Sequence, residues 1–388
     1  MIARDAADTI GAALASVAPY VDEIIVLDTG SVDDTIRVAV SAGARVSSMP
    51  WVDSFSAARE ASYAMAASDW ILHLDADDTL EGGEGIRLSC QAAPAAVGGL
   101  AWRYVTQRDA AGRVVSEIWR ERCTRRGAYR WQGRVHEVLV PRAGALTVPD
   151  DAVRVEHHGY RDAKASAKRN VTLGLLDLAD GIVPRRRTLW YLMRDTCVLE
   201  EWEAAAAYGR EYLAVTADAA AAGEDATDVQ ERYMLLLMLA HCARRGADYV
   251  TAIGYDAAAL GLLPLVPHSY FGLAQSAWAR KRWQEVVHYC DIGRSLHMPP
   301  TSVIPGASME LQSGWLVLYA EALAHLGQFR RALDVAAVAA EWRPDDPALA
   351  ELTRQIEHAA AIARTGEPAE LAELGGEPAG AAAAGGAL

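Results

Sequence analysis

The first eighty residues alternate between short apolar runs and segments with helical periodicity. The apolar runs have the length of strands and are bounded by polar turns, near residues 1–4, 23–28, 44–48 and 70–74. The segments between them space their apolar side chains by three or four residues, as amphipathic helices do, at residues 5–17, 35–42 and 54–67. This order predicts a parallel sheet with helices on its faces.

After residue 99 the pattern becomes rich in β-branched and aromatic residues. Short strands are expected at residues 100–108, 116–124 and 129–140, and they lead to the segment VRVEHHGY at residues 153–160. They would complete a mixed sheet. The remainder of the chain is nearly all helical by pattern.

Residues 186–346 contain an internal repeat. The clearest copy has the spacing of a tetratricopeptide unit, with Ala320, Gly327, Phe329, Ala332, Ala339 and Pro344. Weaker copies contain Ala274, Trp283 and Gly293, or Ala240, Tyr249, Ala252, Ala259 and Pro264, and a degenerate first copy contains Trp202 and Ala205. Small residues at these places let paired helices pack closely, so a helical solenoid is expected.

The patterns divide the chain into four parts. We expect an α/β domain at residues 1–160, a linker helix at 161–185, a tetratricopeptide-like domain at 186–365 and a disordered tail at 366–388. The tail is expected to be disordered because it is rich in Ala, Gly, Glu and Pro.

Composition narrows the possible functions. The 388 residues carry a formal charge of −14, which argues against duplex nucleic acid as a partner. The five cysteines show no CxxC spacing, so a reducing compartment is expected and no zinc site is predicted. We find no signal peptide and no apolar run of membrane-spanning length, and therefore expect a cytoplasmic protein.

The stretch from Trp70 to Asp78 (WILHLDADD) is the strongest candidate for chemistry. An apolar run leads into Asp75, Asp77 and Asp78, and so dense a set of carboxylates needs a cation or a protonated member. A hard divalent ion that also binds phosphates suits such oxygen ligands. A solvated turn after a strand is the alternative, because Asp is common in turns.

Three motifs in correct order resemble glycosyltransferase family 2. They are the segment from Ser16 to Ser31 (SVAPYVDEIIVLDTGS), Phe55 to Arg59 (FSAAR), and Trp70 to Asp78. The chain resembles more closely those members that carry tetratricopeptide-like helices, among them bacterial peptide S-glycosyltransferases. The resemblance implies a GT-A (Rossmann-like) mixed-sheet domain followed by an all-α solenoid. It also implies an inverting, metal-dependent transferase of the hexosyltransferase type.

The family motifs assign roles on the donor side. The donor would be a nucleoside-diphosphate sugar, most readily a UDP-sugar, with Mg²⁺ or Mn²⁺. The implied nucleotide-binding residues are Arg4, Asp28 for the base, Asp75 for the ribose and Arg59 for the diphosphate. Asp77 would bind the metal, and His157 would complete the metal shell, with His158 as the neighbouring candidate.

On the acceptor side, Glu137 in the segment WQGRVHE is the candidate general base. A structural pair at a strand edge is the alternative for His136 and Glu137. Trp131 is either a sugar platform or a buried aromatic. The acceptor is expected to be a peptide, a protein or a glycan held by the helical repeat.

Two departures from the family are visible. Glu60 stands where an Asn usually follows the arginine, and the first strand is short. Both features favour the competing hypothesis, a tetratricopeptide protein-binding scaffold with a catalytically silent GT-A domain.

Two shorter motifs point elsewhere and are set aside. Asp28-Thr29-Gly30-Ser31 spells an aspartic-protease triplet, but no second copy supplies the partner aspartate. Asp75 to Thr79 spells a phosphatase-type DxDxT, but that motif belongs on an opening strand.

Overall fold

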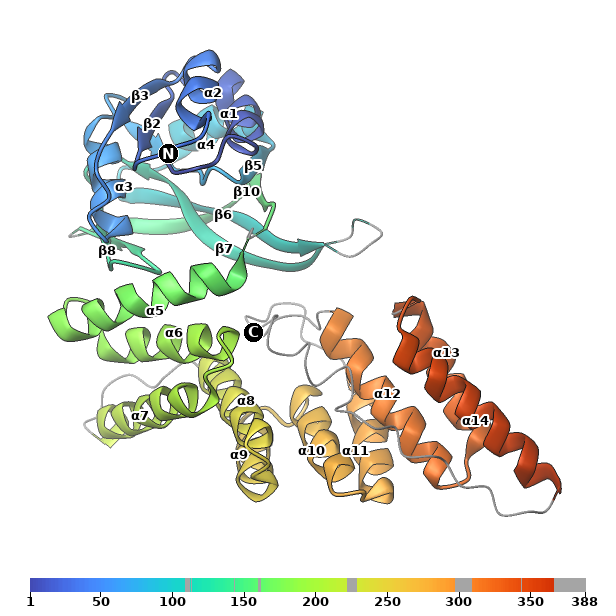
Figure 1. The fold of residues 1–388 in the computed structure, drawn as a ribbon. Helices are drawn as coiled ribbons and strands as arrows, with labels where there is room; N and C mark the ends of the chain where they lie inside the picture. The colour runs from blue at the N-terminus through green and yellow to red at the C-terminus, as the bar shows by residue number, and fades with distance from the viewer. Residues whose placement is uncertain are drawn as a thin grey trace. The chain divides into compact units, whose positions relative to one another are not determined.

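The computed structural model describes residues 1–108, 112, 114–142, 144–159, 162–221, 229–296, 309–342 and 344–365. The chain forms two compact units, Met1–Thr188 and Leu189–Leu388. Strands and helices alternate in the first unit, and the second is helical (Figure 1).

The elements of the first unit are β1 (Ile2–Ala3), α1 (Ile10–Val17), β2 (Ile25–Asp28), α2 (Thr35–Ser41), β3 (Arg45–Ser48), α3 (Phe55–Ala64), β4 (Trp70–Leu72), β5 (Asp78–Glu81), α4 (Ile86–Ala92), β6 (Val97–Arg108), β7 (Val114–Arg125), β8 (Tyr129–Gln132), β9 (Val138–Pro141), β10 (Leu146–His157) and α5 (Ala163–Asp180). Helix α6 (Arg185–Val198) begins in this unit and continues into the next.

The first three strands form a parallel sheet in the order β1-β2-β3. Helix α1 packs its apolar stripe, Ile10, Ala13, Leu14 and Val17, into the core of this unit. It begins at Ile10 instead of at Asp5, because Asp5 has a φ of 48° and cannot belong to a right-handed helix.

The fourth predicted strand does not extend this parallel sheet. Strand β4 lies at the edge of a second sheet, with the order β4-β7-β6-β10-β5, and pairs antiparallel with β7. Within this register Trp70 faces Arg125, whose guanidinium carbon lies 4.4 Å from the Trp70 ring centroid. The length of β7, twelve residues, provides an edge that the two-residue β1 does not. The sheet is mixed, because β6 and β10 are parallel and its other pairs antiparallel.

The aspartate stretch is a turn that follows the carboxyl end of β4 and leads into β5. Strand β4 ends at Leu72, and the backbone amide of Asp78 donates to the carbonyl of Asp75 at 3.1 Å. Strand β5 then begins at Asp78, which is paired with His157 in the antiparallel β5–β10 register. The register therefore places an aspartate and a histidine that are far apart in sequence directly opposite each other.

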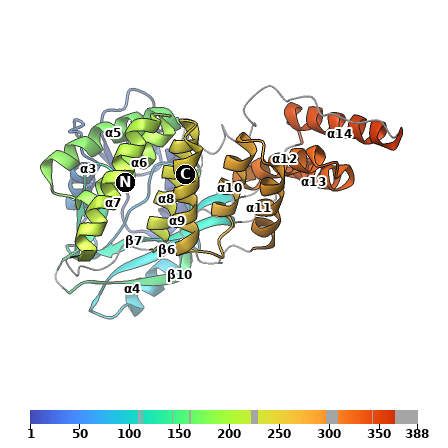
Figure 2. The ribbon, with the colours of Figure 1, turned by 90° about the horizontal axis from the view of Figure 1, so that it is seen from below.

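The second unit consists of helices that follow one another as adjacent pairs (Figure 2). Their bounds are α7 (Trp202–Ala221), α8 (Val229–Arg245), α9 (Tyr249–Leu262), α10 (His268–Ala279), α11 (Trp283–Ser295), α12 (Met309–His325), α13 (Phe329–Trp342) and α14 (Pro347–Thr365). The predicted fold class, a GT-A type α/β domain followed by a tetratricopeptide-like helical part, is confirmed.

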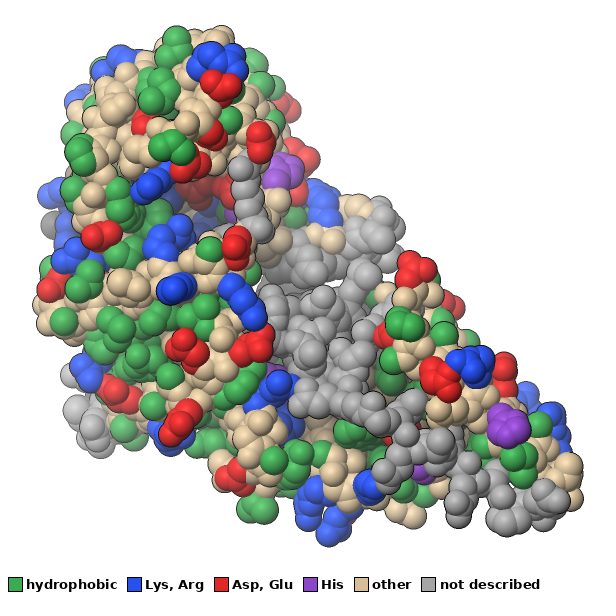
Figure 3. Space-filling model, in the orientation of Figure 1, with side chains coloured by type: hydrophobic (Ala, Val, Ile, Leu, Met, Phe, Trp, Pro, Cys, Tyr) green, Lys and Arg blue, Asp and Glu red, His purple; other side chains and the backbone are tan. Residues whose placement is uncertain are grey.

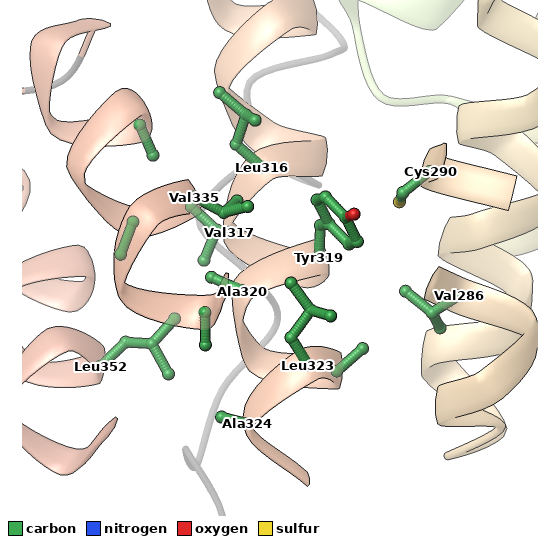
Figure 4. Packing of buried hydrophobic residues seen from close by; sticks show 14 of the residues in the cluster. Val286, Cys290, Leu316, Val317, Tyr319, Ala320, Leu323, Ala324, Val335 and Leu352 are labelled. Carbon is green, nitrogen blue, oxygen red and sulfur yellow. The ribbon is translucent and has the colours of Figure 1, made fainter. Parts of the chain in front are cut away.

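Small residues of the repeat lie where helices meet. Ala320, Ala332 and Ala339 have no exposed surface, and Gly327 forms the turn before α13 with a φ of 70°. Figure 4 shows the side chains of α12 between Val286 and Cys290 of α11 on one side and Val335 and Leu352 on the other. The predicted spacing thus corresponds to close helix packing.

The predicted linker helix, residues 161–185, coincides largely with α5, which lies within the first compact unit. The predicted tail, residues 366–388, lies outside the described residues. Among the helices that the structure describes, none is long and apolar enough to cross a membrane.

Candidate active site

Asp78 is the buried centre of the carboxylate cluster. Its side chain is inaccessible to solvent and accepts a hydrogen bond from the Tyr104 hydroxyl at 3.0 Å. His157 Nδ1 lies 2.9 Å from the same oxygen, Oδ1. The other oxygen, Oδ2, lies 3.3 Å from Nη2 of Arg122. Asp78 therefore anchors the turn from within the protein.

Asp75 is held by two buried arginines. Arg59 on α3 donates through Nη2 to Oδ1 at 2.8 Å, and Arg122 on β7 donates through Nη1 to Oδ2 at 3.3 Å. Burial alone would raise the pKa of Asp75, but the two guanidinium groups outweigh it and keep that pKa well below its usual value. Arg122 also stacks on Tyr104, with its guanidinium carbon 4.4 Å from the ring centroid.

Asp77 differs from Asp75 in that its pKa is raised, and burial has the largest effect on it. Desolvation raises the pKa of Asp77, the adjacent carboxylates of Asp75 and Asp78 raise it further, and His157 opposes them. Asp77, Asp78 and His157 each have one possible ligand atom, and these atoms lie within 4.8 Å of one another. Two carboxylate oxygens and an imidazole nitrogen are a suitable donor set for Mn²⁺ or Mg²⁺.

His157 and His158 have different surroundings. Burial lowers the pKa of His157, but the hydrogen bond to Asp78 and the charge of Asp77 outweigh it, so the pKa is raised. The exposed His158 places Nε2 2.7 Å from the Thr79 hydroxyl, away from the ligand set. Figure 3 shows acidic side chains beside a histidine on the face of the first unit that is turned towards the viewer.

Glu137 is brought to the same network by Arg59. The Arg59 Nε donates to Glu137 Oε1 at 2.6 Å, so one guanidinium joins Glu137 to Asp75. Arg59 and Glu137 are nearly buried, with 12% and 11% of their side chains exposed. The bond fixes the direction in which the Glu137 carboxylate points.

The charges of this network suit a divalent cation. It contains four carboxylates and two guanidinium groups, from Asp75, Asp77, Asp78, Glu137, Arg59 and Arg122. With these six groups ionised and His157 neutral, as a metal ligand must be, two negative charges remain, which is the charge that one Mg²⁺ or Mn²⁺ neutralises. The residues present thus fit the metal that the family resemblance implies.

Arg4 and Asp28 are not connected to the network by the described contacts. The Arg4 side chain is 54% exposed and lies 3.7 Å from the Asp5 carboxylate. The Asp28 carboxylate is buried and accepts hydrogen bonds from the backbone amides of Gly30 and Ser31 at 2.9 and 3.0 Å. It thus caps its own turn, and the predicted contact with a base stays a prediction.

Trp131 and Glu60 have structural partners. The Trp131 ring is buried and makes edge contacts with His73 and Tyr63, so it belongs to the core below Arg59. Glu60 accepts a hydrogen bond from the Trp131 backbone amide. The carboxylate that departs from the family pattern therefore ties α3 to β8.

Sequence reasoning missed Arg122 and Tyr104. Arg122 is a charged residue in a strand, and its only sequence signal is its place on the same strand face as Ile118 and Arg120. Tyr104 gives no signal of its own, because aromatic residues are common in strands. Their roles depend on the β6–β7 pairing, which brings both beside the aspartate turn.

A cavity of about 580 Å³ in the first unit is distinct from the carboxylate cluster. Its lining includes Met1, Ile25, Trp70 and Cys90, and thus the amino ends of β1, β2 and β4. Asp75, Asp77 and Glu137 do not line it. Ligands of open α/β sheets bind at the carboxyl ends of strands, so the cluster and not this cavity is the candidate site.

The chain is similar to known proteins over part of its length. Residues 1–88 match the family described as Glycosyl transferase family 2. A tetratricopeptide repeat-containing protein of Synechococcus elongatus is 54% identical over 80 residues, which are 21% of this chain and 20% of that protein. An uncharacterized glycosyltransferase of Rickettsia felis is 38% identical over 80 residues, 21% of this chain and 28% of the relative.

Glucosyl-3-phosphoglycerate synthases are similar to this chain in sequence and in structure. A glucosyl-3-phosphoglycerate synthase of Mycolicibacterium paratuberculosis is 43% identical over 86 residues, covering 19% of this chain and 26% of that protein. The crystal structure of the Mycobacterium tuberculosis synthase with Mn²⁺ and UDP-glucose is 19% identical and covers 47% of this chain and 78% of that one, with a TM-score of 0.33.

The matches span only about a fifth to just over a quarter of the length of these curated relatives. The family match at residues 1–88 includes Arg59, Asp75 and Asp77, whereas Glu137 and His157 lie beyond it. The family match thus covers residues 1–88, less than a quarter of this chain.

Proposed function

We propose that this protein is a metal-dependent inverting glycosyltransferase, which transfers a hexose from a nucleoside-diphosphate sugar to an acceptor. The observation that carries the proposal is the Asp77–Asp78–His157 ligand set beside an arginine-bound Asp75. The family segment at residues 1–88 and the glycosyltransferase relatives support it.

The charges of the site residues suggest how the donor would be bound. Asp77 and His157 would hold Mg²⁺ or Mn²⁺, with Asp78 beneath them, and the ion would neutralise the departing diphosphate. Arg59 contributes a fixed positive charge beside Asp75, at the place the family resemblance gives to the diphosphate. The resemblance also makes a UDP-sugar the first donor to test.

On the acceptor side, Glu137 takes the proton that the nucleophile loses as it attacks the anomeric carbon. The Arg59 bond to Oε1 holds Glu137 next to the donor residues. Attack from the face opposite the leaving group inverts the anomeric centre. We further propose that the acceptor is a peptide, protein or glycan bound by the helical repeat in the cytoplasm, and cysteine-containing peptides are the first class to test.

The experiment measures release of free nucleoside diphosphate from a panel of nucleotide sugars, with Mn²⁺ and with a chelator. Metal-dependent release, with a product of inverted anomeric configuration, is expected. A retained configuration contradicts the inverting mechanism. If no donor is turned over and no nucleotide binds in the presence of Mn²⁺, the enzyme hypothesis is wrong. The protein-binding scaffold hypothesis then takes its place.

A further inference from the structure

The candidate base lies on a loop with an unfavourable backbone. We call the segment Gly133–Glu137, between β8 and β9, the Glu137 loop. Gly133 has a φ of 100° and His136 a φ of 48°, and the second value is uncommon for a residue with a side chain. A loop of this kind keeps its shape only when its surroundings hold it.

Asp177 on α5 provides the most specific of these contacts. Its carboxylate is 4% exposed and accepts from the backbone amide of Arg134 at 2.8 Å to Oδ2 and 3.1 Å to Oδ1. The amide of Val135 donates to it as well. A buried carboxylate is costly unless hydrogen-bonded, so these amides are the reason that an aspartate is tolerated there.

Other contacts hold the loop on both sides. The backbone amide of Phe55, at the start of α3, donates to the Arg134 carbonyl at 2.8 Å. Nη2 of Arg187 donates to the His136 carbonyl at 2.9 Å. A Cβ on Gly133 would lie 3.2 Å from the Val135 carbonyl oxygen, so the loop leaves little room for a side chain at that position.

We propose that Asp177 is a positioning residue for Glu137. By binding the amides of Arg134 and Val135, it fixes the loop so that the Glu137 carboxylate meets Arg59 on α3. The inference rests on the proposed function, because it assumes that Glu137 is the general base. It assigns a role in that reaction to α5, a helix outside the family match.

The test replaces Asp177 by Asn, which keeps the size but puts an NH₂ group opposite the two amide donors. The matched control is Asp180→Asn, three residues later, whose carboxylate contacts the Arg134 side chain at 2.7 Å and is partly exposed. Two measurements are made on each protein: kcat and donor KM, and amide hydrogen exchange of the Glu137 loop without ligands.

For Asp177→Asn we expect kcat to fall by about 10- to 100-fold with donor KM changed less than about twofold, because a small displacement of a catalytic group is costly. Exchange in the loop should accelerate, while that of β6 and β7 stays the same. Asp180→Asn should behave like the unaltered protein in both measurements.

Three results contradict the inference. Unchanged loop exchange shows that Asp177 does not hold the loop, and an unchanged kcat with a loosened loop shows that holding it does not position the base. A joint loss of kcat, donor affinity and protection in β7 shows a merely structural role. No turnover by the unaltered protein contradicts the proposed function instead, and the exchange measurement still decides the anchoring.

Discussion

Each aspartate of the turn has its own environment, although the three lie within four residues. Asp78 is enclosed by Tyr104, His157 and Arg122, and Asp75 is bound by two guanidinium groups. Asp77 keeps a raised pKa because burial and its acidic neighbours dominate. Asp77 is therefore the member of the turn best placed to gain from a metal ion.

Replacing Asp77 by Asn should abolish metal-dependent nucleotide binding without loss of the fold. The amide has the same shape but no charge for the ion. The raised pKa means that the Asp77 carboxylate is less favourable in the folded than in the unfolded chain, so the apo variant should be at least as stable. The measurement is the melting temperature with and without Mn²⁺ and UDP.

The matched control for this variant is Asp69→Asn, because the Asp69 side chain is 94% exposed nearby in sequence. It should keep the full shift in melting temperature. A normal Mn²⁺-dependent shift in Asp77→Asn would remove Asp77 from the metal shell.

Replacing Arg122 by Met should destabilise the first unit by about 3–5 kcal/mol, the usual cost of removing one partner from a buried ion pair. The variant leaves Asp75 and Asp78 with fewer partners in a buried place. Urea unfolding measures the change. Arg120→Met, at an exposed position on the same face of β7, should cost less than about 1 kcal/mol. Equal losses of unfolding free energy for the two variants would show that Arg122 contributes no more stability than an exposed arginine on the same strand.

At the scale of elements, the sequence pattern predicted which segments are strands and helices better than it predicted their partners. Helices α2 and α3 and strands β2 and β3 lie close to their expected ranges, because their apolar spacing is regular. The pairing of β4 with β7 was not predictable, since strand partners 50 residues apart leave no local signal. Strand β5 was missed because four residues after a turn have no clear period.

The same limit applies to the site. Glu137 and Asp75 could be named from family motifs, but their joining through Arg59 depends on how α3 packs against β8. Arg122 acts through a strand pairing that no spacing along the chain reveals. Asp177 lies 40 residues from the loop it holds and follows an ordinary helical pattern.

The helical repeat should lose stability as the pH falls below neutrality. Burial lowers the pKa of His241 from 6.5 to about 4, and that of His268 likewise. Between these values the unfolded chain binds more protons than the folded one, so acid favours unfolding. The loss is at most about 3 kcal/mol for each histidine. Asp256 acts with the opposite sign, because burial raises its pKa to about 6.

The test is urea unfolding at pH 7 and pH 5 for the unaltered protein and for His241→Phe. Phenylalanine keeps an aromatic ring against Trp202 but cannot titrate. The variant should lose less stability between the two pH values, and the contribution of Asp256 cancels in the comparison. Identical losses would show that His241 does not titrate in this range.

At the scale of the molecule, each compact unit has its own apolar core. One cluster surrounds Leu74, Trp102 and Val155, whereas another surrounds Tyr319 and Leu352 in the helical unit. We expect two calorimetric transitions, because separate cores unfold as separate cooperative units. Mn²⁺ with UDP should raise only one of them, since a ligand stabilises the unit that binds it.

A single transition, shifted as a whole by Mn²⁺ and UDP, would contradict this prediction. In that case the two units would have to be treated as one cooperative structure. The peptide acceptor provides the complementary measurement, because under the proposed function it should raise the other transition.

The balance between Arg122, Arg59 and the surrounding carboxylates has a practical consequence. These contacts hold the aspartate turn together whether or not an ion is bound. Under the proposed function, a chelator should therefore leave the protein folded but inactive, and added Mn²⁺ should restore activity without refolding.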